Sequence, residues 1–244
     1  MPTVHVGCSG FLYDHWKGSF YPSDFPQKQW FQYYTGKFRT VELNVTFYHL
    51  PDKETFNRWY TESPPDFVFA VKGSRFITHV KKLKAVAEPV DVFFSRAVAL
   101  REKLGVVLWQ LPPVLRADPE RLTEFLELVK PYGVRNAFEF REESWTSKKT
   151  AALLKRGKAA FCMADHPSFL DDLPVTADFV YIRRHGEHGS HAACYRAEQI
   201  KGDALRIRRY LRQGKDVFIY YNNDALGCAP RNALELAALL KTKK

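Results

Sequence analysis

Cysteine is scarce in this chain of 244 residues, and its four cysteines are widely scattered. None of Cys8, Cys162, Cys194 and Cys228 belongs to a C-x-x-C pair. The spacing therefore predicts neither a disulfide framework nor a structural zinc site. Cys8 and Cys228 are expected to be small buried residues without a base partner. This use of cysteine favours a reducing compartment, so we expect a cytoplasmic protein.

Long apolar runs are also missing. The longest, such as residues 159–164, are far shorter than the roughly 18 residues that a membrane-spanning helix needs. The first residues, MPTVHVGCSGF, have no basic segment ahead of an apolar one, so we expect a strand there rather than a signal peptide. No glycine-rich phosphate turn follows that strand, which argues against an open dinucleotide-binding sheet and gives no motif for an organic cofactor. We expect no membrane partner.

Apolar and aromatic residues are plentiful, at 45% and 15% of the chain, which is enough for a large core. Lys and Arg number 37 against 27 Asp and Glu, giving a formal net charge of +10. A basic protein of this kind is biased toward anionic partners, such as a phosphorylated small molecule or a nucleic acid. The sequence carries no information on oligomeric state.

Short runs rich in β-branched and aromatic residues recur along the chain, each followed by a helix-like segment. The eight expected strands are residues 3–8, 40–46, 67–72, 106–110, 136–141, 159–165, 179–185 and 217–223. About 30 residues per unit matches a (β/α)8 barrel, in which eight parallel strands alternate with helices. We predict an α/β protein that forms a single TIM-barrel domain over residues 1–244.

The clearest helix signal is Asp118-Pro119-Glu120, an N-cap and an N1 proline before apolar residues at helical spacing.

Polar side chains cluster toward the carboxyl ends of these strands. Because side chains alternate along a strand, Glu42 and Asn44 should share the inward face. The same alternation points Glu139 and Arg141 inward, and likewise Tyr181, Arg183 and His185. The remaining strand ends contribute Lys72, Gln110, Asp165 and Asn222. Barrel enzymes place their active sites at this end, although an internal ion network with a purely structural role is the alternative.

Seven stretches of the chain also match, in order, the landmarks of a known family. They are GCSGFLYDHWKGSFYP, FRTVELNVTFYHLP, FVFAVKGSRFITH, KLGVVLWQLPP, EFREESW, YIRRHG and YYNNDALGCAPRNA. On these motifs the sequence resembles the domain of unknown function 72 family, also called YecE-like. The resemblance covers nearly the whole chain and implies a (β/α)8 barrel in a family without an established reaction. It also implies a structural likeness to barrels of the endonuclease IV and xylose isomerase type.

Carried over motif by motif, the resemblance implies a set of pocket residues that agrees with the strand ends. They are Ser9, Glu42, Asn44, Thr46, Lys72, His79, Gln110, Glu139, Arg141, Asp165, Arg183, His185, Asn222 and Asp224. The sequence departs from the family at Phe11 and Tyr221, which remain aromatic. It departs also at Arg184, which is expected to add a positive charge at the mouth of the barrel.

The first functional hypothesis is an enzyme-like pocket for an anionic, phosphorylated ligand. Lys72, Arg141 and Arg183 would hold the anion, because guanidinium groups make paired bonds to phosphate or carboxylate. Among the candidate catalytic residues, which include Glu42, either Glu139 or Asp165 would be the general base, and His185 or His79 the proton donor. The pattern is compatible with a hydrolase or an isomerase and does not specify the reaction.

Two alternatives remain open from the residues. The first is a nucleic-acid-binding or phosphodiester-acting protein, with the basic surface on the phosphates and the aromatic mouth around an extruded base. The second is a sugar isomerase or epimerase that depends on a divalent metal. Its ligands would be Glu139, Asp165 and His185, whose oxygen and imidazole donors suit Mn²⁺, Mg²⁺ or Zn²⁺.

Overall fold

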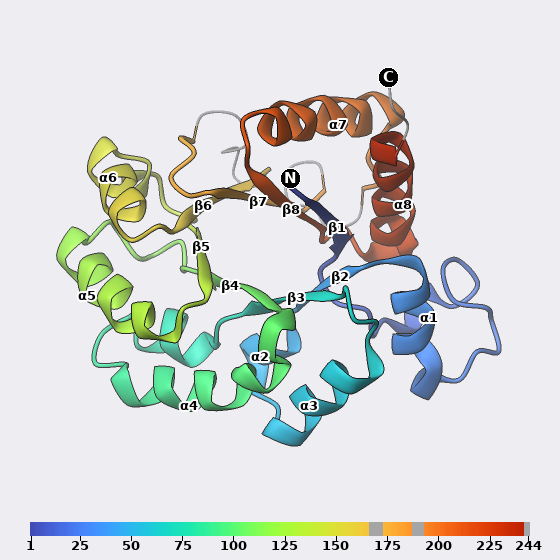
Figure 1. The fold of residues 1–244 in the computed structure, drawn as a ribbon, viewed down its shortest axis with the longest axis horizontal. Coiled ribbons are helices and arrows are strands. Elements are labelled where there is room, and N and C mark those ends of the chain that lie inside the picture. The colour runs from blue at the N-terminus through green and yellow to red at the C-terminus, as the bar shows by residue number, and fades with distance from the viewer. Residues whose placement is uncertain (166–172, 187–192, 242–244) are drawn as a thin grey trace.

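The computed structural model describes residues 1–165, 173–186 and 193–241, and in it eight strands form one parallel barrel (Figure 1). The strands are β1 (Val4–Cys8), β2 (Thr40–Leu43), β3 (Val68–Lys72), β4 (Leu104–Gln110), β5 (Arg135–Glu139), β6 (Ala160–Ala164), β7 (Phe179–Arg184) and β8 (Asp216–Tyr221). Neighbours in the sequence pair from β2 to β8, and β8 pairs with β1. The predicted (β/α)8 barrel is confirmed.

The barrel closes between β1 and β2, where a bridge joins Ser9 to Glu42 and the Gly10 amide donates to the Glu42 carbonyl at 2.8 Å. A side chain on Gly7 would place its Cβ 2.5 Å from the Thr40 carbonyl oxygen. Only glycine allows so close an approach of two backbones, so Gly7 is what brings these strands together.

Helices cover the outside of the barrel. They are α1 (Trp30–Lys37), α2 (Val45–Tyr48), α3 (Lys53–Glu62), α4 (Ala87–Ala97), α5 (Pro119–Val129), α6 (Lys148–Arg156), α7 (Ala197–Arg212) and α8 (Cys228–Lys241). As its sequence predicts, α5 begins after Asp118, whose side chain accepts from the Arg121 amide at 3.0 Å. No helix of the described chain could cross a membrane.

Two connections differ from the predicted strand–helix repeat. Strand β2 ends at Leu43, three residues early, because Asn44 adopts a helical conformation (φ −88°, ψ −21°) ahead of α2. Between β6 and β7, the described residues 173–178 contain no helix. The prediction of a strand was therefore wrong for residues 44–46. The helix expected after β6 is not found in the described part of that connection.

Large and small side chains complement one another inside the barrel. Strands β3, β5 and β6 direct small residues inward, including Ala70, Ala137 and Ala160. Strands β7 and β8 direct aromatic rings into the space, namely Phe179, Tyr181, Phe218 and Tyr220. The interior is therefore packed solid over most of its length, as barrels of eight strands are. The charged residues lie above this packing, at the carboxyl ends of the strands.

Candidate functional site

A chain of ion pairs crosses the upper end of the barrel. Arg183, on β7, places Nη2 2.8 Å from Glu42 Oε1 on β2 and Nη1 2.6 Å from Glu139 Oε2 on β5. All three side chains are buried, with at most 1% of each exposed. The alternation along the strands had predicted that these three residues point inward, and the structure brings them into direct contact. One guanidinium thus bridges two buried carboxylates from two different strands, β2 and β5.

Both carboxylates also accept hydrogen bonds from neutral side chains. Glu42 accepts from Ser9 Oγ and from the Tyr181 hydroxyl, both at 2.6 Å. Glu139 accepts from Gln110 Nε2 at 3.0 Å and pairs with Arg141 Nη2 at 2.5 Å. Tyr181 was not among the predicted site residues, although it precedes Arg183 and His185 on the same face of β7. Its spacing was the signal that could have found it.

The electrostatics of Glu139 follow from these contacts. Burial alone would raise its pKa, but Arg183 and Arg141 outweigh burial and hold the pKa of this carboxyl well below its usual value. A carboxylate so firmly ionised is a poor proton acceptor at neutral pH. The geometry therefore supports Glu139 as an anchor for the two guanidiniums rather than as the general base.

His185 lies against the same network. Its Nε2 is 3.0 Å from Glu139 Oε1, and its Nδ1 is 3.0 Å from the side-chain nitrogen of Asn222. A neutral ring that donates from Nε2 to Glu139 and accepts at Nδ1 from Asn222 fits these two contacts, and Arg141 Nη2 lies 3.1 Å from the same Nε2. Burial, and then the nearby Arg183, lower the pKa of His185 to about 4. The ring is therefore uncharged at neutral pH, which weakens its predicted role as a proton donor.

Lys72, at the end of β3, differs from the other buried charges. Its side chain is buried, and its Nζ lies 4.2 Å from the centre of the Phe47 ring. Within the described chain, its amine makes neither a hydrogen bond nor an ion pair. Burial, with Arg183 as the next cause, lowers the pKa of Lys72 to about 8.

His79 stands on the loop after β3, in a π-helix over residues Phe76–Val80. Its ring meets the Phe47 ring edge to face at 5.0 Å, so His79 and Lys72 both contact Phe47. Burial and the positive charge of Lys72 lower the pKa of His79 to about 4. Like His185, it is uncharged at neutral pH and is not a ready proton donor.

Four predicted residues take structural positions instead. Thr46 donates to the backbone carbonyls of Leu43 and Lys72 at 2.8 and 2.6 Å, which fixes the turn after β2. Asn44 occupies the position before α2 without a capping hydrogen bond from its side chain, and its Oδ1 is covered without a hydrogen-bond partner. The other two are Asp224, whose carbonyl accepts from Trp16 Nε1 at 3.0 Å, and Asp165, described below. Asp224 therefore belongs to the packing of the first loop.

Arg184 was expected to add a charge at the mouth, and this was wrong. Its side chain lies on the opposite face of β7 from Arg183 and pairs with Asp203 on α7. Strand alternation decides this, because consecutive residues point to opposite faces. Buried against its own carboxylate, Arg184 contributes no surplus charge to the mouth.

The three proposed metal ligands do not converge. Both oxygens of Glu139 face guanidinium groups, and His185 Nε2 is turned toward Glu139. Asp165 accepts from the His185 backbone amide at 2.7 Å and from the Tyr195 hydroxyl. In the part of the chain that the structure describes, no group of three or more acidic, His or Cys residues is placed to hold a metal ion. The donor set does not fit a divalent cation.

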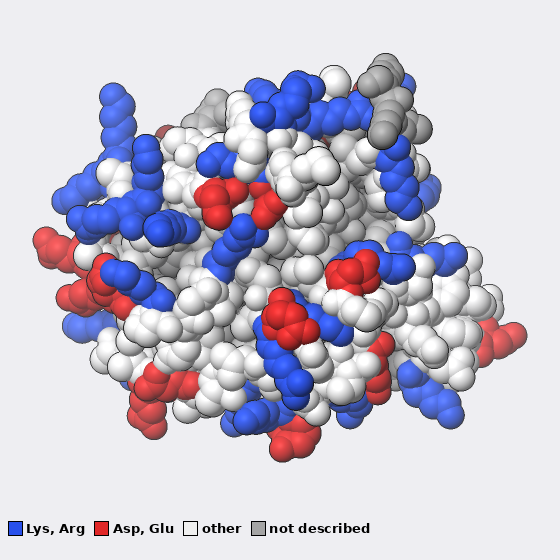
Figure 2. Space-filling model, in the orientation of Figure 1, with Lys and Arg blue, Asp and Glu red and all other residues white. Residues whose placement is uncertain are grey.

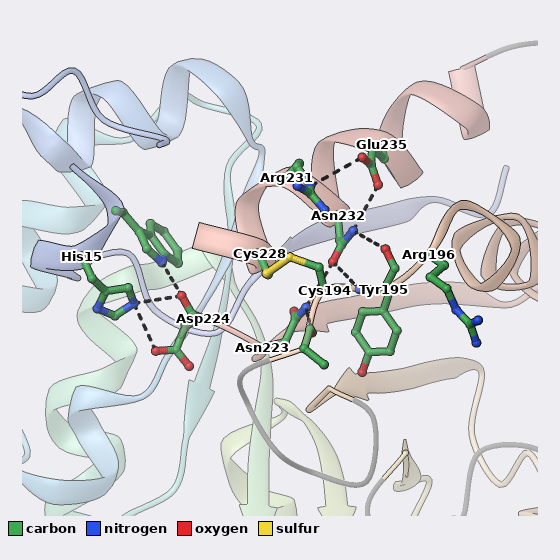
Figure 3. The surroundings of a disulfide bond; sticks show 12 residues. His15, Cys194, Tyr195, Arg196, Asn223, Asp224, Cys228, Arg231, Asn232 and Glu235 are labelled. Atoms are coloured by element: carbon green, nitrogen blue, oxygen red, sulfur yellow. Dashed lines mark hydrogen bonds and ion pairs between the residues drawn. A yellow bond between two sulfur atoms is a disulfide. The ribbon is translucent and has the colours of Figure 1, made fainter. Parts of the chain in front are cut away.

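A disulfide between Cys194 and Cys228 lies beside this region (Figure 3). The expectation of unpaired cysteines was wrong for these two. They are 34 positions apart in the sequence, but their Cα atoms are only 5.0 Å apart in the structure. Cys8 and Cys162 are free and buried. The disulfide links Cys194, in the segment between β7 and α7, to Cys228, the first residue of α8.

Next to the disulfide, Tyr195 connects this segment to the barrel. Its backbone is held on both sides by Asn232, which accepts from the Tyr195 amide at 3.0 Å and donates to its carbonyl at 3.1 Å (Figure 3). Its hydroxyl donates to Asp165 and accepts from the Gly186 amide at 2.6 Å. Sequence reasoning missed Tyr195 and Asn232, because neither lies on a strand end.

The surplus of basic side chains lies partly at the other end of the molecule. Figures 1 and 2 view the barrel from the end at which the strands begin, and Lys and Arg gather there over α6 and α7 (Figure 2). Helix α7 carries Arg206, Arg209 and Arg212, which line a shallow groove with Gly202 and Leu205. This cluster therefore does not adjoin the mouth, which lies at the far end.

Comparisons with known proteins agree with the fold. A crystal structure of a DUF72 family protein from Thermotoga maritima is 30% identical, with a TM-score of 0.86, covering 98% of this chain and all of that one. The UPF0759 protein YunF of Bacillus subtilis is 24% identical over 97% of this chain and 94% of its own length. The D-psicose 3-epimerase of Clostridium cellulolyticum, at 10% identity and a TM-score of 0.60 over 97% of this chain and 98% of its own, shares the barrel fold alone.

The family model described as protein of unknown function DUF72 matches residues 5–244. Together with the barrel and its ordered motifs, that match shows that the chain belongs to the DUF72 family.

Proposed function

We propose that the carboxyl end of the barrel binds a small ligand carrying an anionic group, and that Lys72 and Arg141 hold this group. The observation that carries the proposal is Lys72, a buried cation that makes no ion pair with any described residue. A buried charge without a counter-ion costs several kcal/mol. An anion bound beside Lys72 would offset that cost.

The charge balance of the described network supports the same conclusion. Lys72, Arg141 and Arg183 stand against two carboxylates, Glu42 and Glu139, while His185 is neutral. Arg183 is fully engaged by the two carboxylates, so it organises the site rather than contacting the ligand. Arg141 pairs with Glu139 through Nη2, and 14% of its side chain is exposed. Of the three cations first proposed to hold the anion, two remain in that role.

The test is thermal unfolding with inorganic phosphate, glycolate and a panel of phosphosugars. A ligand present at about a hundred times its dissociation constant should stabilise the fold by about 2.7 kcal/mol. For a protein of this size that is a rise in Tm of several degrees. Lys72→Met should weaken binding about ten- to a hundredfold, since bonds to charged groups contribute about 1.5–3 kcal/mol.

Arg135→Gln is the matched control, because Arg135 lies at the opposite end of the barrel, where it pairs with Asp216 at 2.9 Å. It should leave the ligand response intact. The proposal would be overturned by the absence of any shift in the parent protein, or by an equal shift in Lys72→Met. Nucleotides and short oligonucleotides belong in the panel, since a response confined to oligonucleotides would favour a nucleic-acid-binding protein instead.

A further inference from the structure

The chain contains a second buried lysine, Lys103, whose hydrogen bonds can be compared with those of Lys72. Lys103 is buried near the opposite end of the barrel and donates to the Tyr60 carbonyl at 2.7 Å and to the Ser63 carbonyl and hydroxyl, both at 2.9 Å. Three acceptors match the three donors of an ammonium group. Lys103 is thus held as a structural cation, whereas Lys72, equally buried, has no acceptor in the described chain.

The amine of Lys72 is also reachable. The only fully covered polar side-chain atoms without a partner in the described residues are Asn44 Oδ1 and Asn223 Oδ1, so Lys72 Nζ keeps some exposed surface. One side of the amine rests on the face of Phe47. The nitrogen therefore keeps a surface that no hydrogen-bond partner among the described residues occupies.

Two fixed positive charges lie in the same site. Like burial, Arg183 and Arg141 lower the pKa of the Lys72 amine, and together these effects outweigh Glu139 and Glu42, which raise it. A lysine in such surroundings is activated as a nucleophile, because its neutral form carries the reactive lone pair. The same guanidinium of Arg141 would attract an anionic substituent on the molecule under attack.

We propose that Lys72 condenses with the carbonyl group of a small oxo-acid or oxo-phosphate anion to form an imine. This inference rests on the anion site proposed above and names the substrate class. The nitrogen lone pair attacks the carbonyl carbon, and the π electrons of the C=O bond move to oxygen. One proton passes from the nitrogen to that oxygen, which gives a neutral carbinolamine. The hydroxyl then leaves as water with a proton taken from solvent while the nitrogen lone pair forms the C=N bond, and the iminium returns its remaining N–H proton to solvent to give the imine.

The experiment is reductive trapping on the intact wild-type protein, with glyoxylate as the probe. Borohydride delivers hydride to the imine carbon, is itself oxidised, and leaves a stable carboxymethyl group on the amine. Peptide mapping then compares Lys72 with Lys103 and with the exposed Lys149. At pH 7.5 Lys72 should be labelled at least about tenfold faster than either, since an unperturbed lysine with a pKa near 10.4 is almost wholly protonated.

Two further probes separate the parts of the proposal. Glycolate has the anion without the carbonyl, so it should slow labelling of Lys72 by competition. Glycolaldehyde has the carbonyl without the anion, so it should label Lys72 more slowly than glyoxylate does. Equal labelling of Lys72 and Lys149 by glyoxylate would overturn the imine. If glycolate still raised Tm in that case, the anion site would stand alone, and if it did not, both proposals would fail.

Discussion

At the scale of single residues, Arg183 is the side chain on which the charged end of the barrel depends. It binds Glu42 through Nε and Nη2 and Glu139 through Nη1. Burying three charges is costly, and the arrangement is stable only while each has its partner. Removing the guanidinium would leave two carboxylates without their counter-ion in the interior.

Arg183→Met should therefore lower the free energy of unfolding by about 3–5 kcal/mol, the range for a broken buried pair. Urea unfolding measures this directly. Arg135→Met, the same substitution at an ion pair whose side chains are 34% and 23% exposed, should cost only about 1 kcal/mol. A loss at position 183 no larger than the loss at position 135 would show that the buried network does not stabilise the fold.

At the scale of elements, the segment between β7 and α7 is bonded to α8 through Cys194 and Tyr195. The disulfide and the two hydrogen bonds between Asn232 and Tyr195 join Cys194 and Tyr195 to α8 (Figure 3). Asn223, in the turn between β8 and α8, donates from Nδ2 to the Ala193 carbonyl at 2.9 Å. Through its hydroxyl, Tyr195 reaches Asp165, which accepts from the His185 amide. A chain of hydrogen bonds thus connects Tyr195 to the backbone of His185 in the candidate site.

Reduction of the disulfide should lower the free energy of unfolding by about 2–4 kcal/mol, because a closed loop of this length restricts the unfolded chain. Alkylation in denaturant should modify Cys8 and Cys162 alone in air-exposed protein, and all four cysteines after reduction. Cys194→Ser should reproduce the loss of stability without reductant. Four reactive cysteines before reduction would contradict the pairing.

At the scale of the whole molecule, buried neutral histidines make stability depend on pH. The pKa of His185 falls from 6.5 to about 4 on folding, chiefly through burial. Between these two values the unfolded chain binds a proton that the folded chain does not, so stability decreases as pH falls through this window. His79, whose pKa is also lowered to about 4, acts in the same direction.

From pH 7 to pH 5, His185 alone should account for a loss of about 2 kcal/mol. His185→Gln should make the pH profile of the unfolding free energy shallower by that amount, with a residual slope from His79 and from His5, whose pKa burial also lowers. Urea titrations at several pH values provide the measurement. Parallel profiles for the two proteins would mean that His185 does not titrate differently in the folded state.

Much of the architecture was predictable because it depends on local pattern. The alternation in β5 and β7 predicted correctly which side chains point inward, since the two-residue period of a strand needs no tertiary information. The end of β2 was not predictable in this way. Thr46 bonds to the carbonyl of Lys72, 26 residues later, and such a contact has no trace in the local sequence.

The sequence by itself determined the barrel, its strand faces and the collection of polar residues at one end. Only the tertiary structure decided which of those charged side chains pair with one another. It showed that Arg183 and Arg184 engage separate carboxylates, that Cys194 and Cys228 meet, and that Lys72 is left without a described counter-ion. The physical reason is that ion pairs and disulfides depend on distances of a few ångströms between segments far apart in the chain, which only packing of the whole barrel fixes.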